Sequence, residues 1–169
     1  RQLARRWAMA LLALVLTWTA LAFLHLQRHR PLMGEVISRE RNFFGVLTVV
    51  ERSADGQRER LMLHGATVHG LEIDDAPALG YHGPGSGVAR ALTVLQTRGP
   101  LHIGVVGLGT GTMAAHAREN DTLRFYEINP AVTAIARAHF HYLKDHPVVP
   151  GDARVSLATE EPRKYNLLV

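Results

Sequence analysis

The chain has 169 residues, which is room for about one ordinary domain, and it contains no cysteine. The lack of cysteine excludes a disulfide framework and a thiolate metal site, and it suits a reducing compartment. Five of the 19 Lys and Arg residues lie within residues 1–30, which hold no acid, so the other 14 face 15 Asp and Glu, a net charge of about −1. A nucleic-acid-binding domain carries its excess positive charge on its folded surface, so this distribution argues against a nucleic-acid partner.

An uncharged run of 18 residues extends from Trp7 to Leu24. As a helix it would be about 27 Å long, enough to cross a bilayer, and the flanking arginines would anchor it at lipid headgroups. A cleaved signal peptide, with Ala20-Leu21-Ala22 as the cleavage site, and a buried helix are the alternatives. Because the apolar run continues to Leu26, we expect a transmembrane helix with basic flanks over residues 1–30.

Residues 31–80 have the pattern of a small antiparallel β platform. The β-branched and aromatic run from Asn42 to Val50 predicts a strand, residues 53–56 a turn and residues 60–64 a second strand. A third, short strand is expected over residues 65–70. A helix should follow from Ser86 to about Gln96, with Ser86 as its cap.

From Pro100 onward the chain alternates strands and helices, which indicates an α/β fold with a parallel sheet of the Rossmann type over residues 81–169. Strands are predicted over residues 101–106, 123–128 and 165–169, and helices over residues 112–119 and 130–139. Asn129-Pro130 is typical of a helix start. The chain begins with Arg1 and ends within the last predicted strand, so we expect it to be part of a longer protein.

A glycine-rich turn, Gly107-Leu108-Gly109-Thr110-Gly111, joins the first of these strands to its helix. Glycine allows the positive φ of a sharp turn and lets a ligand approach the backbone, although purely structural turns use it too. Glu127 follows Gly107 by 20 residues, where an acid accepts hydrogen bonds from the ribose of an adenosine ligand. The G-x-G-x-G spacing favours a cofactor of the S-adenosylmethionine type over a dinucleotide.

Several motifs together resemble the spermidine-synthase-like family, many members of which carry membrane helices ahead of this domain. The resemblance covers residues 39–169 and rests on the following segments: Arg41-Asn42-Phe43-Phe44-Gly45, His64-Gly65-x-Thr67-x-His69-Gly70, Tyr81-His82-Gly83-Pro84-x-Ser86-Gly87, the glycine turn, Phe125 to Pro130, and Gly151-Asp152-Ala153-Arg154.

The resemblance implies transfer of an aminopropyl group from decarboxylated S-adenosylmethionine to a small-molecule amine, in polyamine biosynthesis. It implies that the cofactor is held by Gly107, Gly109, Thr110 and Gly111 in the turn, by Glu127 at the ribose, and by Asp152 and Ala153 at the adenine. Tyr81 and His82 occupy the place of the family's substrate motif. A general base is expected beyond Val169.

The sequence departs from the family at two acids. Thr110 replaces an aspartate of the turn, and Gly83 replaces a glutamate that holds the diamine, so activity on putrescine is in question. Glu72, Asp74 and Asp75 are the nearest acids in the chain that could replace them. An S-adenosylmethionine-dependent methyltransferase and a non-catalytic domain that senses a nucleoside or polyamine remain alternatives.

The other residue patterns in the chain predict no further functional site. The histidines lack the i, i+4 pairing of a hydrolytic zinc site, so no metal is expected. Tyr142, Lys144 and His146 are expected at a solvated helix end. We expect the soluble domain to lie on the cytoplasmic side of the cell (inner) membrane, where nucleoside cofactors are made, and a homo-oligomer is compatible with this arrangement.

Overall fold

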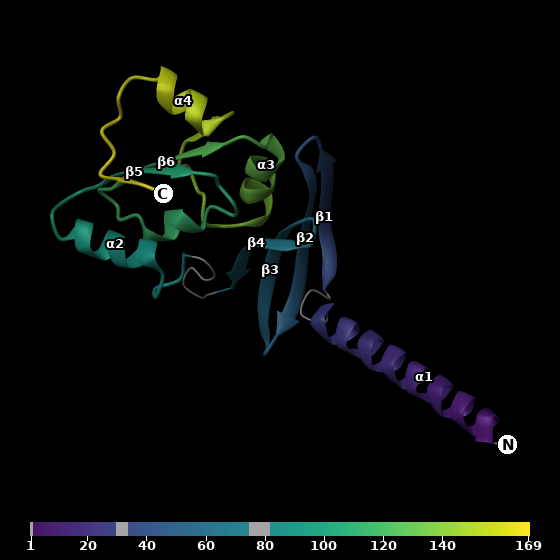
Figure 1. The fold of residues 1–169 in the computed structure, drawn as a ribbon. Helices are drawn as coiled ribbons and strands as arrows, with labels where there is room; N and C mark the ends of the chain where they lie inside the picture. Colours follow the sequence, from purple (N-terminus) through teal and green to yellow (C-terminus); the bar gives the residue numbers. More distant parts are fainter. Residues whose placement is uncertain (1, 30–33, 75–81) are drawn as a thin grey trace. The chain divides into compact units, whose positions relative to one another are not determined.

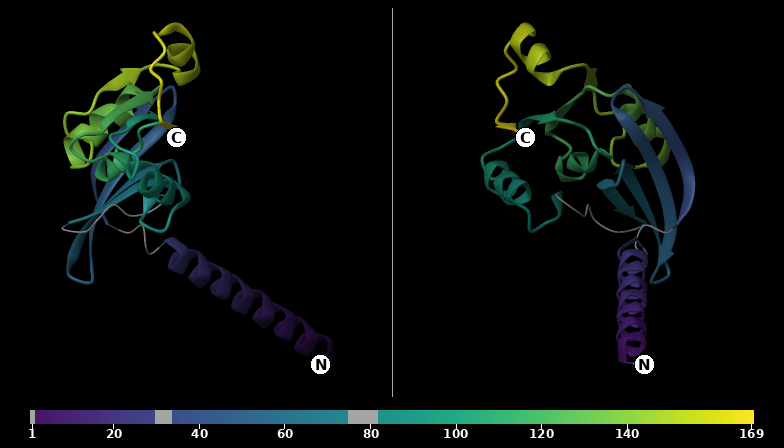
Figure 2. Two further views of the ribbon diagram at one scale, coloured as in Figure 1. Left: turned by 90° about the vertical axis from the view of Figure 1, so that its left-hand side faces the viewer. Right: turned by 45° about the vertical axis from the view of Figure 1, so that its right-hand side comes forward.

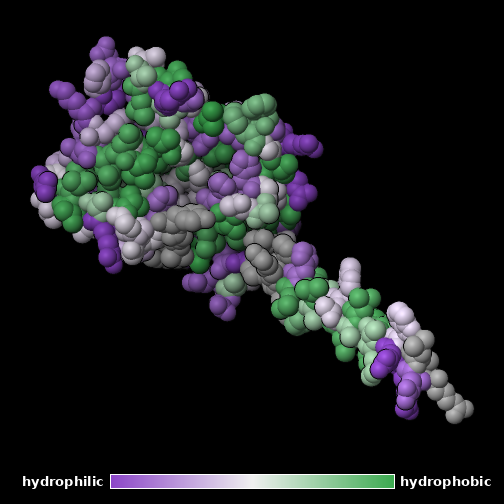
Figure 3. All heavy atoms as spheres, in the orientation of Figure 1, coloured by the Kyte–Doolittle hydropathy of each residue, from purple (hydrophilic) through white to green (hydrophobic). Residues whose placement is uncertain are grey.

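The structure, a computed structural model, describes residues 2–29, 34–74 and 82–169, and it divides into two compact units, Arg1–Met33 and Gly34–Val169. In the first unit, helix α1 spans Gln2–His29. Its segment Arg5–Leu26, 22 residues, is long and apolar enough to cross a membrane. Figure 3 shows apolar side chains along most of this helix, and its large apolar residues, including Trp7 and Trp18, are exposed within the unit.

The second unit begins with an antiparallel sheet of four strands in the order β1-β2-β3-β4 (Figure 1). The strands are β1 (Glu35–Asn42), β2 (Gly45–Ala54), β3 (Gln57–His64) and β4 (Thr67–Ile73). Leu47 and Val49 of β2 and Met62 of β3 are buried, and Val49 is paired with Met62 across the strands. Leu47, Val49 and Met62 belong to the main hydrophobic core, so the face of the sheet that carries them packs against that core. Figure 2 shows the strands of this sheet curving together.

The single strand predicted from Asn42 to Val50 is wrong at its start, because a hairpin turn interrupts it. Asn42 ends β1, and its side-chain Oδ1 accepts a hydrogen bond from the Phe44 N–H at 2.9 Å, which closes the turn. Gly45, with φ of +128°, then begins β2. Backbone geometry of this kind is open mainly to glycine, so the turn depends on that residue.

A parallel sheet follows, in the order β7-β6-β5-β8. Its strands are β5 (His102–Val106), β6 (Thr122–Glu127), β7 (Val148–Pro150) and β8 (Leu167–Leu168). The α-helices of this unit are α2 (Gly87–Gln96), α3 (Pro130–His139) and α4 (Ala153–Thr159). The predicted cap of α2 is confirmed, since Ser86 Oγ accepts a hydrogen bond from the Ala89 N–H at 3.2 Å, and Asn129 caps α3 as expected.

The helix predicted over residues 112–119 is instead a five-residue 3₁₀ helix, η3 (Thr112–His116). Ala114 N–H donates to the Gly111 carbonyl at 2.8 Å, the i→i+3 bond of that helix type. The chain then becomes extended at Ala117, and Asp121 Oδ2 accepts from the Arg118 N–H at 2.9 Å. This local side-chain bond favours a turn over further helix.

One hydrophobic core joins the two sheets of the second unit. It combines Leu47, Val49 and Met62 of the antiparallel sheet with buried residues of the parallel sheet, including Ile103 and Phe125. Helix α3 contacts both β2 and β6 and buries Ile135 and Ala136. The two sheets therefore pack as one body, with the carboxyl ends of the parallel strands close to the antiparallel sheet at the cavity described next.

Candidate functional site

Three of the predicted site segments meet at the carboxyl edge of the parallel sheet. Gly107 directly follows β5, Glu127 ends β6, and Asp152 lies two residues after β7. The Gly107 N–H donates to the Tyr126 carbonyl at 2.8 Å, and the Gly151 N–H donates to the Glu127 carbonyl at 2.9 Å. Ligands of open parallel sheets bind outside this edge, which makes it the candidate site.

A cavity of about 300 Å³ opens at this edge, between the two sheets. The parallel sheet and its connections contribute Gly107, Leu108, Gly109, Glu127, Ile128, Asn129 and Val132, and the antiparallel sheet and its first turn contribute Phe44, Leu47, Met62, His64 and His69. The lining is mostly apolar, with a few polar side chains. This is the usual composition of a small-molecule site.

The glycine turn has the backbone geometry that its sequence predicts. Gly107 and Gly109 have φ of +89° and +56°. A Cβ on Gly109 would lie 3.3 Å from the His69 carbonyl oxygen, so tight packing excludes a side chain there. A Cβ on Gly107 would meet no described atom within 4 Å. Gly107 therefore leaves open space on the cavity side, where a ligand could approach the backbone.

Glu127 is the acid of the cavity. It is 8% exposed, and its two carboxylate oxygens each accept one backbone N–H, Oε2 from Leu108 and Oε1 from Asn129, both at 2.8 Å. A carboxylate has about four lone-pair positions, so one further acceptor position remains on each oxygen. The two backbone bonds hold the carboxylate still while leaving it able to accept from a ligand diol.

Thr110 and Gly111 belong to the same turn but do not line this cavity. Thr110 is 1% exposed, and its Oγ1 lies 2.8 Å from Thr112 Oγ1. Its side chain fills the space over Gly70, where an added Cβ would come within 2.2 Å of Thr110 Cγ2. A Cβ on Gly111 would lie 3.1 Å from Leu143. The structure gives both residues packing contacts.

Asp152 and Ala153 lie at the start of α4. Asp152 caps this helix, because its Oδ1 accepts from the Arg154 N–H at 2.8 Å and the Val155 N–H at 3.3 Å. The Asp152 side chain is exposed, and Ala153 is the first residue of the helix. Both lie at the same sheet edge as Glu127, but neither lines the cavity.

Of the two predicted substrate residues, Tyr81 lies outside the described residues. His82 is half-buried, and its carbonyl oxygen bonds to His116 Nε2 of η3. Burial lowers the pKa of His82, and the neighbouring His116 lowers it further. His82 does not line the cavity.

The structure adds residues to the cavity that sequence reasoning had not assigned there. His64 Nε2 donates to the Phe44 carbonyl at 2.7 Å, and the His64 and His69 rings lie 5.3 Å apart between centroids. Asn129 was assigned only as a helix cap. His64 ends one predicted strand and His69 lies in the next, but which face of the sheet they occupy depends on strand register.

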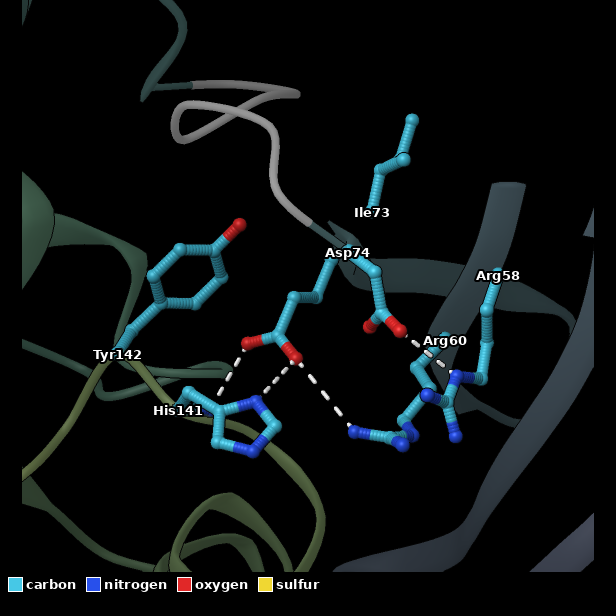
Figure 4. Close-up of a pocket in the computed structure, with 7 residues that line it drawn as sticks. Arg58, Arg60, Ile73, Asp74, His141 and Tyr142 are labelled. Carbon is cyan, nitrogen blue, oxygen red and sulfur yellow. Dashed lines mark hydrogen bonds and ion pairs between the residues drawn. The ribbon is translucent and has the colours of Figure 1, made fainter.

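A second cavity, of about 620 Å³, lies beside the end of β4 (Figure 4). It is lined by Arg58, Arg60, Glu72, Ile73, Asp74, His141 and Tyr142. Asp74 pairs with Arg58 at 2.7 Å, and the buried Glu72 carboxylate accepts from the His141 N–H at 2.8 Å. Glu72 and Asp74, two of the candidate acids, therefore line this second cavity with partners already in place, and Asp75 lies outside the described residues.

Tyr142 contradicts the prediction of a solvated helix end. Helix α3 ends at His139, and Tyr142 follows in a loop where it is half-buried against the second cavity. Burial raises the pKa of Tyr142, and the Glu72 carboxylate raises it further.

Over the described ranges, no group of three or more His, Asp or Glu side chains is arranged to hold a metal ion. In comparisons with known proteins, no family model matches the chain, and no curated protein is significantly similar to it.

Proposed function

We propose that Gly34–Val169 is a Rossmann-type domain of the spermidine-synthase-like kind. It would bind decarboxylated S-adenosylmethionine and transfer the aminopropyl group to an amine. The observation that carries the proposal is Glu127, a buried carboxylate with an acceptor position free on each oxygen, in a cavity beside Gly107. A ribose diol supplies the two donors that such a carboxylate lacks.

The order of the parallel strands supports the fold assignment. Numbered within their own sheet, β7-β6-β5-β8 are the third, second, first and fourth strands in the chain. This is the order of the first four strands of a Rossmann fold, whose ligand lies where the strand order reverses, beside the first strand. Gly107 follows that first strand, β5.

The local structure after the turn favours a nucleoside over a dinucleotide. A dinucleotide places its pyrophosphate on the N-terminus of a full α-helix, whose aligned dipoles attract negative charge. Here the turn leads into a 3₁₀ helix of five residues, Thr112–His116, which offers little of that field. Leu108, Ile128 and Val132 give the cavity an apolar wall suited to a purine base.

The proposed reaction is a displacement at carbon. The amine nitrogen attacks the carbon beside the sulfonium, the carbon–sulfur bond breaks, and its electron pair stays on sulfur, which leaves as neutral 5′-methylthioadenosine. The new ammonium then gives its proton to a general base. Because Gly83 stands in place of the family's diamine-binding glutamate, and the buried Thr110 supplies no charge in the turn, we propose that putrescine is a poor acceptor and that another amine is the natural one.

The binding step is tested by calorimetric titration of the complete chain in detergent with 5′-methylthioadenosine. Glu127→Gln is the informative variant, since its amide oxygen still accepts from one of the Leu108 and Asn129 N–H groups, whereas Glu127→Ala would leave both without an acceptor. A charge-assisted pair with ribose contributes about 1.5–3 kcal/mol, so affinity should fall more than tenfold. The exposed Glu119→Gln is the matched control and should bind normally. Equal affinity of folded Glu127→Gln and wild type would remove Glu127 from the site.

The reaction class is tested by incubating the full-length protein, including the segment expected to carry the general base, with decarboxylated S-adenosylmethionine and a panel of amines, and separately with S-adenosylmethionine. Aminopropylated product with an amine other than putrescine supports the proposal. A methylated product would make the domain a methyltransferase. Binding of 5′-methylthioadenosine without turnover of either donor would favour the sensor.

A further inference from the structure

The orientation of the Asn129 side chain is fixed by its neighbours. Asn42 Oδ1 accepts from the Phe44 N–H, so Asn42 Nδ2 is turned toward Asn129 and donates to its Oδ1 at 2.6 Å. The same Oδ1 accepts from the Ala131 N–H at 3.1 Å, as the N-cap of α3. Exchanging the oxygen and nitrogen of Asn129 would set its NH₂ against two donors, so chemistry fixes which atom is which.

This arrangement leaves the Asn129 Nδ2 as a buried donor on a residue that lines the cavity. Asn129 is 3% exposed and lines the cavity, and its Nδ2 has no hydrogen-bond partner within residues 34–74 and 82–169. Buried polar groups are nearly always paired, and one left over calls for a partner such as a ligand or water. The helix cap needs only the oxygen, which Asp or Ser would also supply.

The unpaired donor adjoins the free acceptor of the same cavity. Glu127 Oε1 already accepts from the backbone N–H of Asn129 at 2.8 Å, and both residues line the cavity. The ionised carboxylate can only accept hydrogen bonds, and the amide nitrogen can only donate them. A hydroxyl does both, since its hydrogen can go to Glu127 while its oxygen accepts from Asn129.

We propose that Asn129 Nδ2 donates to a ribose hydroxyl oxygen of the bound nucleoside and that, with Glu127, it makes the site selective for ribonucleosides over their deoxy analogues. The proposal rests on the nucleoside binding proposed above. Asn129 is then a specificity-determining residue as well as a helix cap.

The test is a binding cycle on the complete chain in detergent, with 5′-methylthioadenosine and its 2′-deoxy and 3′-deoxy analogues as probes. Asn129→Asp keeps the shape and the acceptor for Asn42 and Ala131 but removes the donor. We expect it to bind 5′-methylthioadenosine at least tenfold more weakly. Wild type should lose at least tenfold when the contacted hydroxyl is deleted, and the loss in Asn129→Asp should be at least threefold smaller, because only the bond to Glu127 is then left to lose.

Two further variants make the result decisive. Asn129→Ser, which also caps a helix, replaces Asn129→Asp if the latter fails to fold. Asn166→Asp is the matched control, an exposed asparagine whose Oδ1 accepts from the His102 N–H at the other end of β5, and it should leave the binding cycle unchanged. If wild type binds and a folded Asn129 variant keeps full discrimination against both deoxy analogues, the proposed role of Asn129 is wrong, but the proposed function still stands. If wild type binds none of the probes, the proposed function falls and this inference with it.

Discussion

Two buried acids at opposite ends of the parallel sheet have different surroundings. Asp121 Oδ1 accepts from the Leu101 N–H at 2.8 Å, and its Oδ2 accepts from the Arg118 N–H at 2.9 Å and the Gln96 amide at 3.0 Å. Arg118 also pairs with it directly, at 3.2 Å. The carboxylate of Asp121 is thus satisfied within the fold, whereas Glu127 keeps free acceptor positions toward a cavity.

We predict that Asp121 controls part of the acid stability. Burial alone would raise its pKa, but the hydrogen bonds from Arg118, Leu101 and Gln96 outweigh it and hold the pKa well below its usual range. A carboxyl whose pKa is depressed by folding contributes stability above its unfolded pKa, about 3.9, and loses it as pH falls toward the folded pKa. The free energy of unfolding of the wild-type protein should therefore decline below about pH 4.

Denaturant unfolding of the complete chain in detergent, repeated from pH 7 to pH 3, measures this effect. Asp121→Asn should lower the free energy of unfolding by about 1–3 kcal/mol at pH 7, since the new amide cannot accept at every bond, and it should show a shallower decline in acid. Asp55→Asn, in an exposed turn where Asn tolerates the positive φ of 52°, should retain the wild-type profile. If the free energy of unfolding of Asp121→Asn fell below pH 4 as steeply as that of wild type, the decline would come from other titrating groups.

The candidate site could be predicted from the sequence only in part, residue by residue. The glycine turn and Glu127 are adjacent features of two neighbouring strands, so their spacing is enough to place them at one sheet edge. His64, His69 and Asn129 reach the cavity through packing between two sheets that are far apart in the chain. The sequence predicted that the segments around Thr110 and Asp152 belong to the site. The directions of those two side chains depend on contacts that residue spacing does not encode.

Among the secondary-structure elements, those with strong local signals were predicted well. Helix α3 begins at Pro130 after the Asn129 cap, and α2 follows Ser86, because capping is a local interaction. Strand β1, with sequence EVISRERN, was missed since its charged and mostly exposed residues carry little alternation. It exists because its backbone pairs with β2 at the edge of the sheet, where charged side chains are typical.

The contact between β4 and the glycine turn yields a prediction for these two elements. Because a Cβ on Gly70 would come within 2.2 Å of Thr110 Cγ2, Gly70→Ala should force the turn or the strand to shift. Overpacking of this kind costs about 1–3 kcal/mol. Thr110→Ala removes the two nearest obstructing atoms, Cγ2 and Oγ1, and leaves only Thr110 Cβ, at 2.9 Å, so the Gly70→Ala, Thr110→Ala double variant should recover part of the loss.

Thermal unfolding of the two single variants and the double variant measures this coupling. Gly87→Ala, at the first position of α2 with nothing within 4 Å of the added Cβ, is the control and should be neutral or slightly stabilising. Additive losses in the double variant would show that the two positions do not press on each other. The same packing predicts that Thr110→Asp, which places a charge in this buried space, destabilises the domain.

At the scale of the whole molecule, the two units bury their residues differently. The core cluster lies entirely within Gly34–Val169, where both sheets and α3 contribute to it. Helix α1 belongs to the other unit, and its described large apolar side chains are all exposed, Val15 being the least exposed at 49%. Because this core is separate from α1, we predict that residues 34–169 form a folded, soluble protein without that helix. The exposed apolar surface of α1 favours an apolar environment over water.

We predict that this environment is a membrane and that α1 stays in the mature protein. The segment Arg5–Leu26 has 22 residues, which span about 33 Å as a helix, slightly more than the hydrocarbon thickness of a bilayer. The complete chain should therefore remain in the membrane fraction after an alkaline carbonate wash, whereas residues 34–169 should be recovered in the soluble fraction with a cooperative thermal transition. A reporter fused after Val169 should be active on the cytoplasmic side, where the proposed cofactor is made. Recovery of a soluble chain whose first residue lies near Phe23 would identify a cleaved signal peptide instead. A reporter active only outside the cytoplasm would contradict the cytoplasmic placement, because the domain would then lie apart from its proposed cofactor.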